Sequence, residues 1–113
     1  PFRHLGADWA RACSPAIRLF IASLALWRGL EADLDADLEI GFGGGLLVGA
    51  TATELREMEE KAAIERSAGL DVEWLDRGAL AGTAPYLAPR AAGGAFCPAE
   101  GKANPLLVAP AYA

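Results

Sequence analysis

Residues 44–62 read GGLLVGATATELREMEEKA, and the fold of much of the chain is predicted from this stretch. Its first part, Gly44–Ala50, is a short apolar run bounded by glycines and is typical of a buried strand. Thr51 and Glu54 stand three residues apart, the spacing at which each side chain satisfies the other residue's backbone N–H at the start of a helix. The following residues have an apolar helical face that ends at Gly69. A strand followed by an amphipathic surface helix is therefore predicted.

A long helix is predicted upstream of this unit. Ser14 is a favoured N-cap residue, and Pro15 at the first helical position loses no hydrogen bond. Apolar residues then recur at spacings of three and four: Ile17, Phe20, Ile21, Leu24, Trp27, Leu30 and Leu34. We expect one helix over Ala16–Leu34, with Trp27 buried in the middle of its apolar stripe. The residues before it, Pro1 to Ala12, are expected to form a polar, irregular lead.

Two further strands complete the predicted fold. Residues 70–75 alternate apolar and acidic side chains, and residues 91–98 contain a second short apolar run. We predict an α+β single domain over residues 1–113, with an antiparallel sheet built from Ile40–Gly49, Asp71–Leu75 and Ala92–Cys97. The helices Ala16–Leu34 and Thr53–Ala68 are expected to pack on one face, because two layers are the simplest way to bury these apolar surfaces.

The composition limits the possible partners. Hydrophobic residues make up 53% of the 113 residues, and the mean hydropathy is +0.22, which is apolar for a short chain. This excess predicts an exposed apolar face that binds a partner or another part of the same protein, most simply as a homodimer. No window approaches the roughly 18 continuous apolar residues of a membrane span. The net charge of −5 and the lack of a basic run argue against nucleic-acid binding.

Few residues are candidates for chemistry. Cys13 and Cys97 lie far apart without metal-ligand spacing, so we expect two reduced thiols in a cytoplasmic protein and no metal site. His4 is the only histidine, and a lone histidine near a chain end is more often solvated than catalytic. The run at residues 41–45, GFGGG, lacks the third glycine of a dinucleotide loop because Leu46 occupies that place. It also precedes its strand, so a bulge or a close backbone approach is predicted.

Several motifs occur together in a recognisable order. They are the glycine-flanked strand at residues 44–48, AGLDVEWLD at residues 68–76, PYLAP at residues 85–89, GGAFCPAEG at residues 93–101 and Asn104-Pro105. Their order and spacing resemble FAD-dependent oxidoreductases of the D-amino-acid oxidase type, which include glycine and sarcosine oxidases. The resemblance covers nearly the whole chain.

The resemblance implies a function and a division of labour. Such enzymes remove a hydride from the carbon that bears an amine and pass it to FAD, and this stretch belongs mainly to their substrate-binding half. The FAD-binding half begins with a GxGxxG fingerprint that is missing here, so we expect a fragment of a longer chain that alone is inactive and binds no FAD. The full-length protein would bind FAD and a small amino-acid or amine substrate.

The resemblance also suggests three residues close to the substrate or the flavin. Arg3 and His4 resemble the residues at which the family's chain enters the substrate-binding half. Phe42 lies at the start of the strand that forms the floor of the pocket in this family. The alternative hypothesis is a non-catalytic oligomerisation or interaction module, whose likeness to the family is only ancestral.

Overall fold

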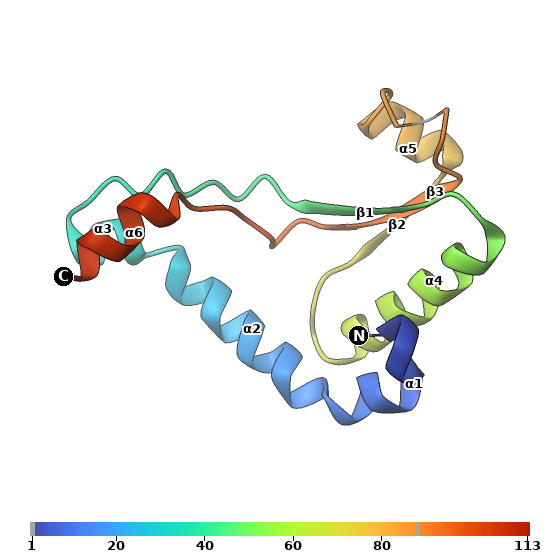
Figure 1. Ribbon diagram of the computed structural model, residues 1–113, viewed down its shortest axis with the longest axis horizontal. Coiled ribbons are helices and arrows are strands. Elements are labelled where there is room, and N and C mark those ends of the chain that lie inside the picture. The colour runs from blue at the N-terminus through green and yellow to red at the C-terminus, as the bar shows by residue number, and fades with distance from the viewer. Residues whose placement is uncertain (1, 88) are drawn as a thin grey trace.

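The computed structural model describes residues 2–87 and 89–113, with side chains from residue 5 onward, and its fold is α+β, as predicted (Figure 1). In order, the elements are α1 (Phe2–Ala12), α2 (Ser14–Trp27), α3 (Leu30–Leu34), β1 (Gly45–Gly49), α4 (Ala52–Ser67), β2 (Glu73–Asp76), α5 (Arg77–Thr83), β3 (Gly93–Cys97) and α6 (Pro105–Tyr112).

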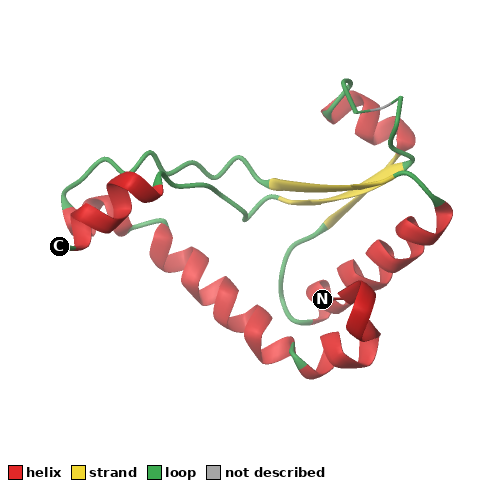
Figure 2. Cartoon of the chain, in the orientation of Figure 1, coloured by secondary structure: helices red, strands yellow, loops and turns green. Residues whose placement is uncertain are grey.

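The strands form one antiparallel sheet in the order β1-β3-β2 (Figure 2). Gly45 lies opposite Cys97 on β3, and Glu73 on β2 lies opposite Phe96. All three predicted strands are present, but β1 begins at Gly45 and not at Ile40. Gly44 causes this difference: its φ is 83°, and a Cβ there would lie 2.4 Å from the Phe96 ring, so the regular ladder stops at this residue.

Two irregular arms extend the β1–β3 pair beyond the sheet. We call residues 38–44 the first arm and residues 100–104 the second arm. Gly41 and Lys102 exchange both backbone hydrogen bonds, at 2.9 and 2.8 Å, and the Gly44 N–H donates to the Glu100 carbonyl at 3.0 Å. The arms therefore run side by side from the sheet to α3 and α6 (Figure 1).

Helix α4 begins with the predicted capping box. The Glu54 carboxylate accepts hydrogen bonds from the backbone N–H groups of Ala50 (2.9 Å) and Thr51 (3.1 Å), and the Thr51 hydroxyl accepts one from the Glu54 N–H (3.2 Å). The helix then packs on one face of the sheet, close to β1 and β3. Gly49 permits this approach, because a Cβ there would lie 2.9 Å from the Met58 sulfur.

Helix α5 covers the opposite face of the sheet (Figure 1). Leu80, Ala84 and Ala91 form a buried cluster there, against which Leu46, Leu75 and Leu87 pack. The prediction placed the helices Ala16–Leu34 and Thr53–Ala68 on one face and did not include this third helix on the other face. Gly49 faces α4, whereas Leu46, three residues earlier, faces the α5 cluster, because side chains alternate between the two faces of a strand. Each face of the sheet therefore has its own helix.

The N-terminal region also differs from the prediction. The expected irregular lead is helix α1, which is interrupted at Gly6 (φ 80°, ψ 178°). It packs against α4. The Arg11 guanidinium lies 3.0 Å from Asp8 on the same helix and 3.7 Å from Glu60 on α4. Contact with α4 stabilises a helix in this polar stretch. The local sequence pattern does not reveal this contact.

The long helix is shorter than expected and does not lie on the sheet. It ends at Trp27, and α3 follows after a break at Gly29. Helix α2 packs against α1, α3 and α4, and none of its described residues is buried. Trp27 is half-buried, so the prediction of a buried Trp27 is wrong.

The chain has an open shape with exposed apolar side chains. Its radius of gyration is 16.2 Å, whereas a compact domain of this length has about 13 Å. Leu19 and Leu26 of α2 are 72% and 74% exposed. Among the described helices, no single one is long and apolar enough to cross a membrane; α2 and the second part of α1 pass that test only as a pair bent by 62°.

Candidate functional site

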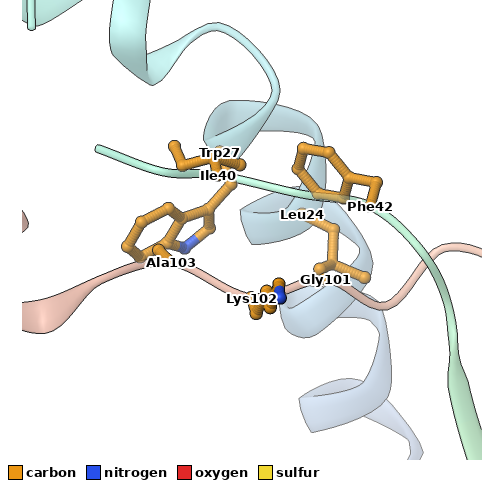
Figure 3. A pocket seen from close by; sticks show the side chains of 7 residues that line it. All are labelled: Leu24, Trp27, Ile40, Phe42, Gly101, Lys102 and Ala103. Atoms are coloured by element: carbon orange, nitrogen blue, oxygen red, sulfur yellow. The ribbon is translucent and has the colours of Figure 1, made fainter. Parts of the chain in front are cut away.

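A hollow of about 220 Å³ lies where the two arms meet α2 (Figure 3). Trp27 and Phe42 stand on either side of it, with Leu24 between them. Its lining residues are Leu24, Trp27, Ile40, Phe42, Gly101, Lys102 and Ala103. The walls are aromatic and aliphatic, so this hollow can hold a small apolar group.

A hydrogen-bond network fixes the first arm against α3 and the second arm. One carboxylate oxygen of Glu31 accepts from the backbone N–H groups of Leu38 (2.9 Å) and Ile40 (3.2 Å). The Asn104 N–H donates to the Leu38 carbonyl at 3.0 Å, and its side-chain amide donates to Glu39 at 3.0 Å. Leu38 is fully buried by this arrangement. The network therefore holds the rim of the hollow in one conformation.

Two cations border the hollow. The Arg28 guanidinium carbon lies 4.2 Å from the centre of the Phe42 ring, within the range of a cation–π interaction. Lys102 lines the hollow from the second arm. Neither forms a salt bridge to any side chain that the structure describes. The positive charge at the rim favours a ligand with a negative group.

The structure separates the residues that the sequence analysis selected. Phe42 lies on the first arm, three residues before β1, and lines the hollow. Arg3 and His4 belong to α1, which packs against α4 away from the arms (Figure 1), and their side chains lie outside the described part of the chain. A role for these three residues stays a prediction.

The other residues of the hollow were not predicted from the sequence. Trp27 was assigned to the core because it lies on the apolar stripe of α2. Arg28 and Lys102 carried no motif, and only the contact between the arms brings Lys102 close to Phe42. A pairing between residues some sixty positions apart has no local sequence signal.

Comparison with known proteins identifies the family. A sequence model of the family described as FAD dependent oxidoreductase (DAO) matches residues 3–113. The chain belongs to this family. No curated protein matches the chain.

Two solved structures have the same fold. The chain matches L-proline dehydrogenase from P. horikoshii with a TM-score of 0.74 at 18% identity, over 84% of this chain and 25% of that one. It matches glycine oxidase from Geobacillus kaustophilus with a TM-score of 0.74 at 25% identity, over 80% of this chain and 26% of that one. The chain thus spans about a quarter of the length of the solved structures it matches.

The N-termini of α4 and α6 do not fit the phosphates of FAD. A dinucleotide phosphate needs free N–H groups at a helix start after a glycine loop. At α4, the Thr51 hydroxyl and the Glu54 carboxylate already occupy this place, and the carboxylate would repel a phosphate. At α6, the Asn104 side chain caps the Leu106 N–H, and Pro105 has no N–H to offer. We therefore derive no step of a flavin reaction for these residues.

A second hollow, of about 340 Å³, lies between α4 and the sheet and contains Cys97. Burial raises the pKa of the Cys97 thiol, and the negative charges of Glu100 and Glu65 raise it further, against the lowering effect of backbone hydrogen bonds. A raised pKa makes the thiol a poor nucleophile. Lys61 and Glu65 form an ion pair at the edge of this hollow. Within the described residues, no cluster of His, Cys, Asp and Glu could hold a metal ion.

Proposed function

We propose that this chain is the substrate-binding portion of an FAD-dependent oxidoreductase that acts on the CH–NH bond of amino acids or related amines. The observation that carries this proposal is the match, over most of this chain, to two structures named for an amino acid, a proline dehydrogenase and a glycine oxidase. The family match over residues 3–113 supports the redox class.

The chain is, on this proposal, a single domain of a longer protein. It spans about a quarter of the matched structures, and the starts of α4, α5 and α6 are capped by the chain's own side chains. We infer that FAD is bound by other segments of the full-length protein, and that the 113-residue chain alone binds no FAD and has no oxidase activity.

The proposed role of this chain is to shape the substrate pocket and to exclude water from it. Phe42 is the best supported of the three candidates because it lines an apolar hollow next to the cations Arg28 and Lys102. Arg3 and His4 remain proposals that rest on the family resemblance. The cytoplasmic location expected from the free thiols of Cys13 and Cys97 also stays a prediction.

We also propose that the isolated chain forms a homodimer. Its exposed apolar side chains include Leu19, Phe20 and Leu26 on α2 and Leu47 and Val48 on β1. Apolar surface of this extent is usually covered in proteins, and a two-fold pairing covers the same patch twice.

The proposed function is tested with the complete natural reading frame that contains this sequence. Purified protein is incubated with FAD and a panel of amino acids, secondary amines and matched 2-hydroxy acids, and the carbonyl products are measured. We expect products from amines and none from the hydroxy acids. Turnover of hydroxy acids alone would contradict the CH–NH assignment. A reading frame that begins near Pro1 and stops near Ala113 would favour the interaction module instead.

A further inference from the structure

The first arm contains a backbone kink at Glu39. Its φ is 53°, in the left-handed region that non-glycine residues adopt only at an energetic cost. Such a conformation persists where the surrounding structure holds it in place. The kink lies three residues before Phe42, so it affects the direction in which the arm approaches the hollow. The groups that hold this kink therefore contribute to the position of the Phe42 ring.

One side chain of α3 holds the kink from both sides. The N–H groups of Leu38 and Ile40, the two neighbours of the kinked residue, donate to the same carboxylate oxygen of Glu31, at 2.9 and 3.2 Å. Hydrogen bonds to a charged acceptor are roughly twice as strong as those between neutral groups. Glu31 is half-buried, so water competes less for these bonds than it would at the surface. Removal of this carboxylate would leave both N–H groups without their partner.

The backbone between the kink and the ring is also held. Only Gly41 separates Ile40 from Phe42. Gly41 exchanges both backbone hydrogen bonds with Lys102, at 2.9 and 2.8 Å. The ring itself lies against Gly101, because a Cβ on this glycine would be 2.8 Å from the ring and 2.7 Å from the Gly41 carbonyl oxygen. A restraint on Ile40 is therefore transmitted to the Phe42 ring through a single residue that has little freedom to move.

We propose that Glu31 is a positioning residue for the substrate pocket: its carboxylate holds the kink at Glu39 and thereby keeps the Phe42 ring at the side of the hollow. The inference rests on the proposed function and adds a residue that acts from outside the lining of the hollow. Without the carboxylate, the arm can relax from the left-handed conformation and the ring loses its fixed place. Substrate binding then weakens, whereas the rate of the redox step at the flavin is retained.

The test uses the complete flavoprotein and its best amino-acid or amine substrate. The half-saturating substrate concentration and the limiting rate of anaerobic flavin reduction are measured for the wild type and its variants. We expect a several-fold higher half-saturating concentration in Glu31→Ala, with a limiting rate within about twofold of the wild type. Glu31→Gln should behave as the wild type, because its amide oxygen can accept the same two N–H groups. The control Asp33→Ala, which removes an exposed carboxylate from the same helix, should have no effect.

Further measurements separate positioning from a general loss of stability. In a Phe42→Ala background, Glu31→Ala should raise the half-saturating concentration no further, because Glu31 acts only through this ring. Hydrogen exchange of residues 38–44, measured without substrate, should be faster in Glu31→Ala and unchanged in Glu31→Gln. FAD content and circular dichroism identify the folded variants. If Glu31→Ala does not fold, Glu31→Asp provides the same test with smaller effects, because it keeps the charge and withdraws the oxygen by one methylene.

The outcomes distinguish this inference from the proposed function. If an amine reduces the flavin but the half-saturating concentration is unchanged in the folded Glu31 variants, the inference is rejected and the proposed function stands. Unchanged exchange of residues 38–44 in these variants, or additive effects of Glu31→Ala and Phe42→Ala, would lead to the same conclusion. A wild-type flavin that no amine reduces would reject the proposed function and this inference together.

Discussion

The Arg28 guanidinium lies 4.2 Å from the centre of the Phe42 ring and joins the C-terminal end of α2 to the first arm. This contact, together with the bonds of Glu31 to the same arm, keeps Phe42 at the side of the hollow. An exposed cation–π pair contributes about 0.5–1 kcal/mol. This is enough to bias the position of the first arm, which is not paired as a regular strand along its whole length.

A double-mutant cycle measures this contact. Arg28→Ala, Phe42→Leu and the combined variant are compared with the wild type by urea unfolding. We expect a coupling free energy of about 0.5–1 kcal/mol. Additive effects of the two single substitutions would mean that the ring and the guanidinium do not interact in solution.

Gly44 and Gly43 give a matched pair of glycine substitutions. Gly44→Ala should lower the free energy of unfolding by more than about 1 kcal/mol, because φ is 83° and a Cβ would lie 2.4 Å from the Phe96 ring. Gly43→Ala should change it by less than about 0.5 kcal/mol, because no atom lies within 4 Å of its Cβ position. Equal effects in chemical denaturation would contradict this geometry.

The capping box of α4 predicts a third effect. Thr51→Ala removes the acceptor for the Glu54 N–H and should cost about 1 kcal/mol of unfolding free energy. Thr51→Ser keeps a hydroxyl and should retain most of the stability. Thermal unfolding of the two variants distinguishes these cases, and a Thr51→Ala curve equal to that of the wild type would show that the cap is dispensable.

Cys97 predicts a pH dependence of stability. Its folded pKa is raised by burial, so the folded state holds the thiol proton more tightly than the unfolded state. The resulting stabilisation is fully present below the unfolded pKa of a thiol, about 8.5, and is lost as the pH rises from there through the folded pKa. Urea unfolding from pH 7 to 10 should show a smaller loss of stability in Cys97→Ala. A loss equal to that of the wild type would assign the dependence to other groups.

Local signals predicted the parts of the fold that depend on local chemistry. Thr51 and Glu54 indicated the start of α4. Ser14-Pro15 indicated the start of α2, but the N-cap is Cys13 and not Ser14, and no side chain caps this helix. Apolar runs indicated β1 and β3, and the alternation of apolar and acidic residues indicated β2. The packing partners could not be predicted in this way: the stripe of α2 contains apolar residues at helical spacing, but none of its described residues is buried in this chain. An apolar face shows that a surface needs a partner and does not identify that partner.

The candidate site was predictable only in part. Phe42 was selected from the family resemblance, whereas Trp27 and Lys102 line the same hollow, and Arg28 contacts Phe42, only because the paired arms meet the end of α2. That pairing depends on Glu31, Asn104 and Gly44, whose roles appear only in three dimensions. Non-local contacts of this kind leave no periodic pattern in a single sequence.

The central claim, that this chain forms part of an amine substrate pocket, is tested most directly by anaerobic titration of the complete flavoprotein with its best amino-acid or amine substrate. Flavin absorbance is recorded for the wild type, for Phe42→Ala and for the control Leu19→Ala on the exposed side of α2. We expect full bleaching by the substrate in all three proteins, an unchanged FAD content, and a several-fold higher half-saturating substrate concentration for Phe42→Ala alone. An unchanged substrate dependence in Phe42→Ala, or bleaching by no amine at all in the wild type, would contradict the claim.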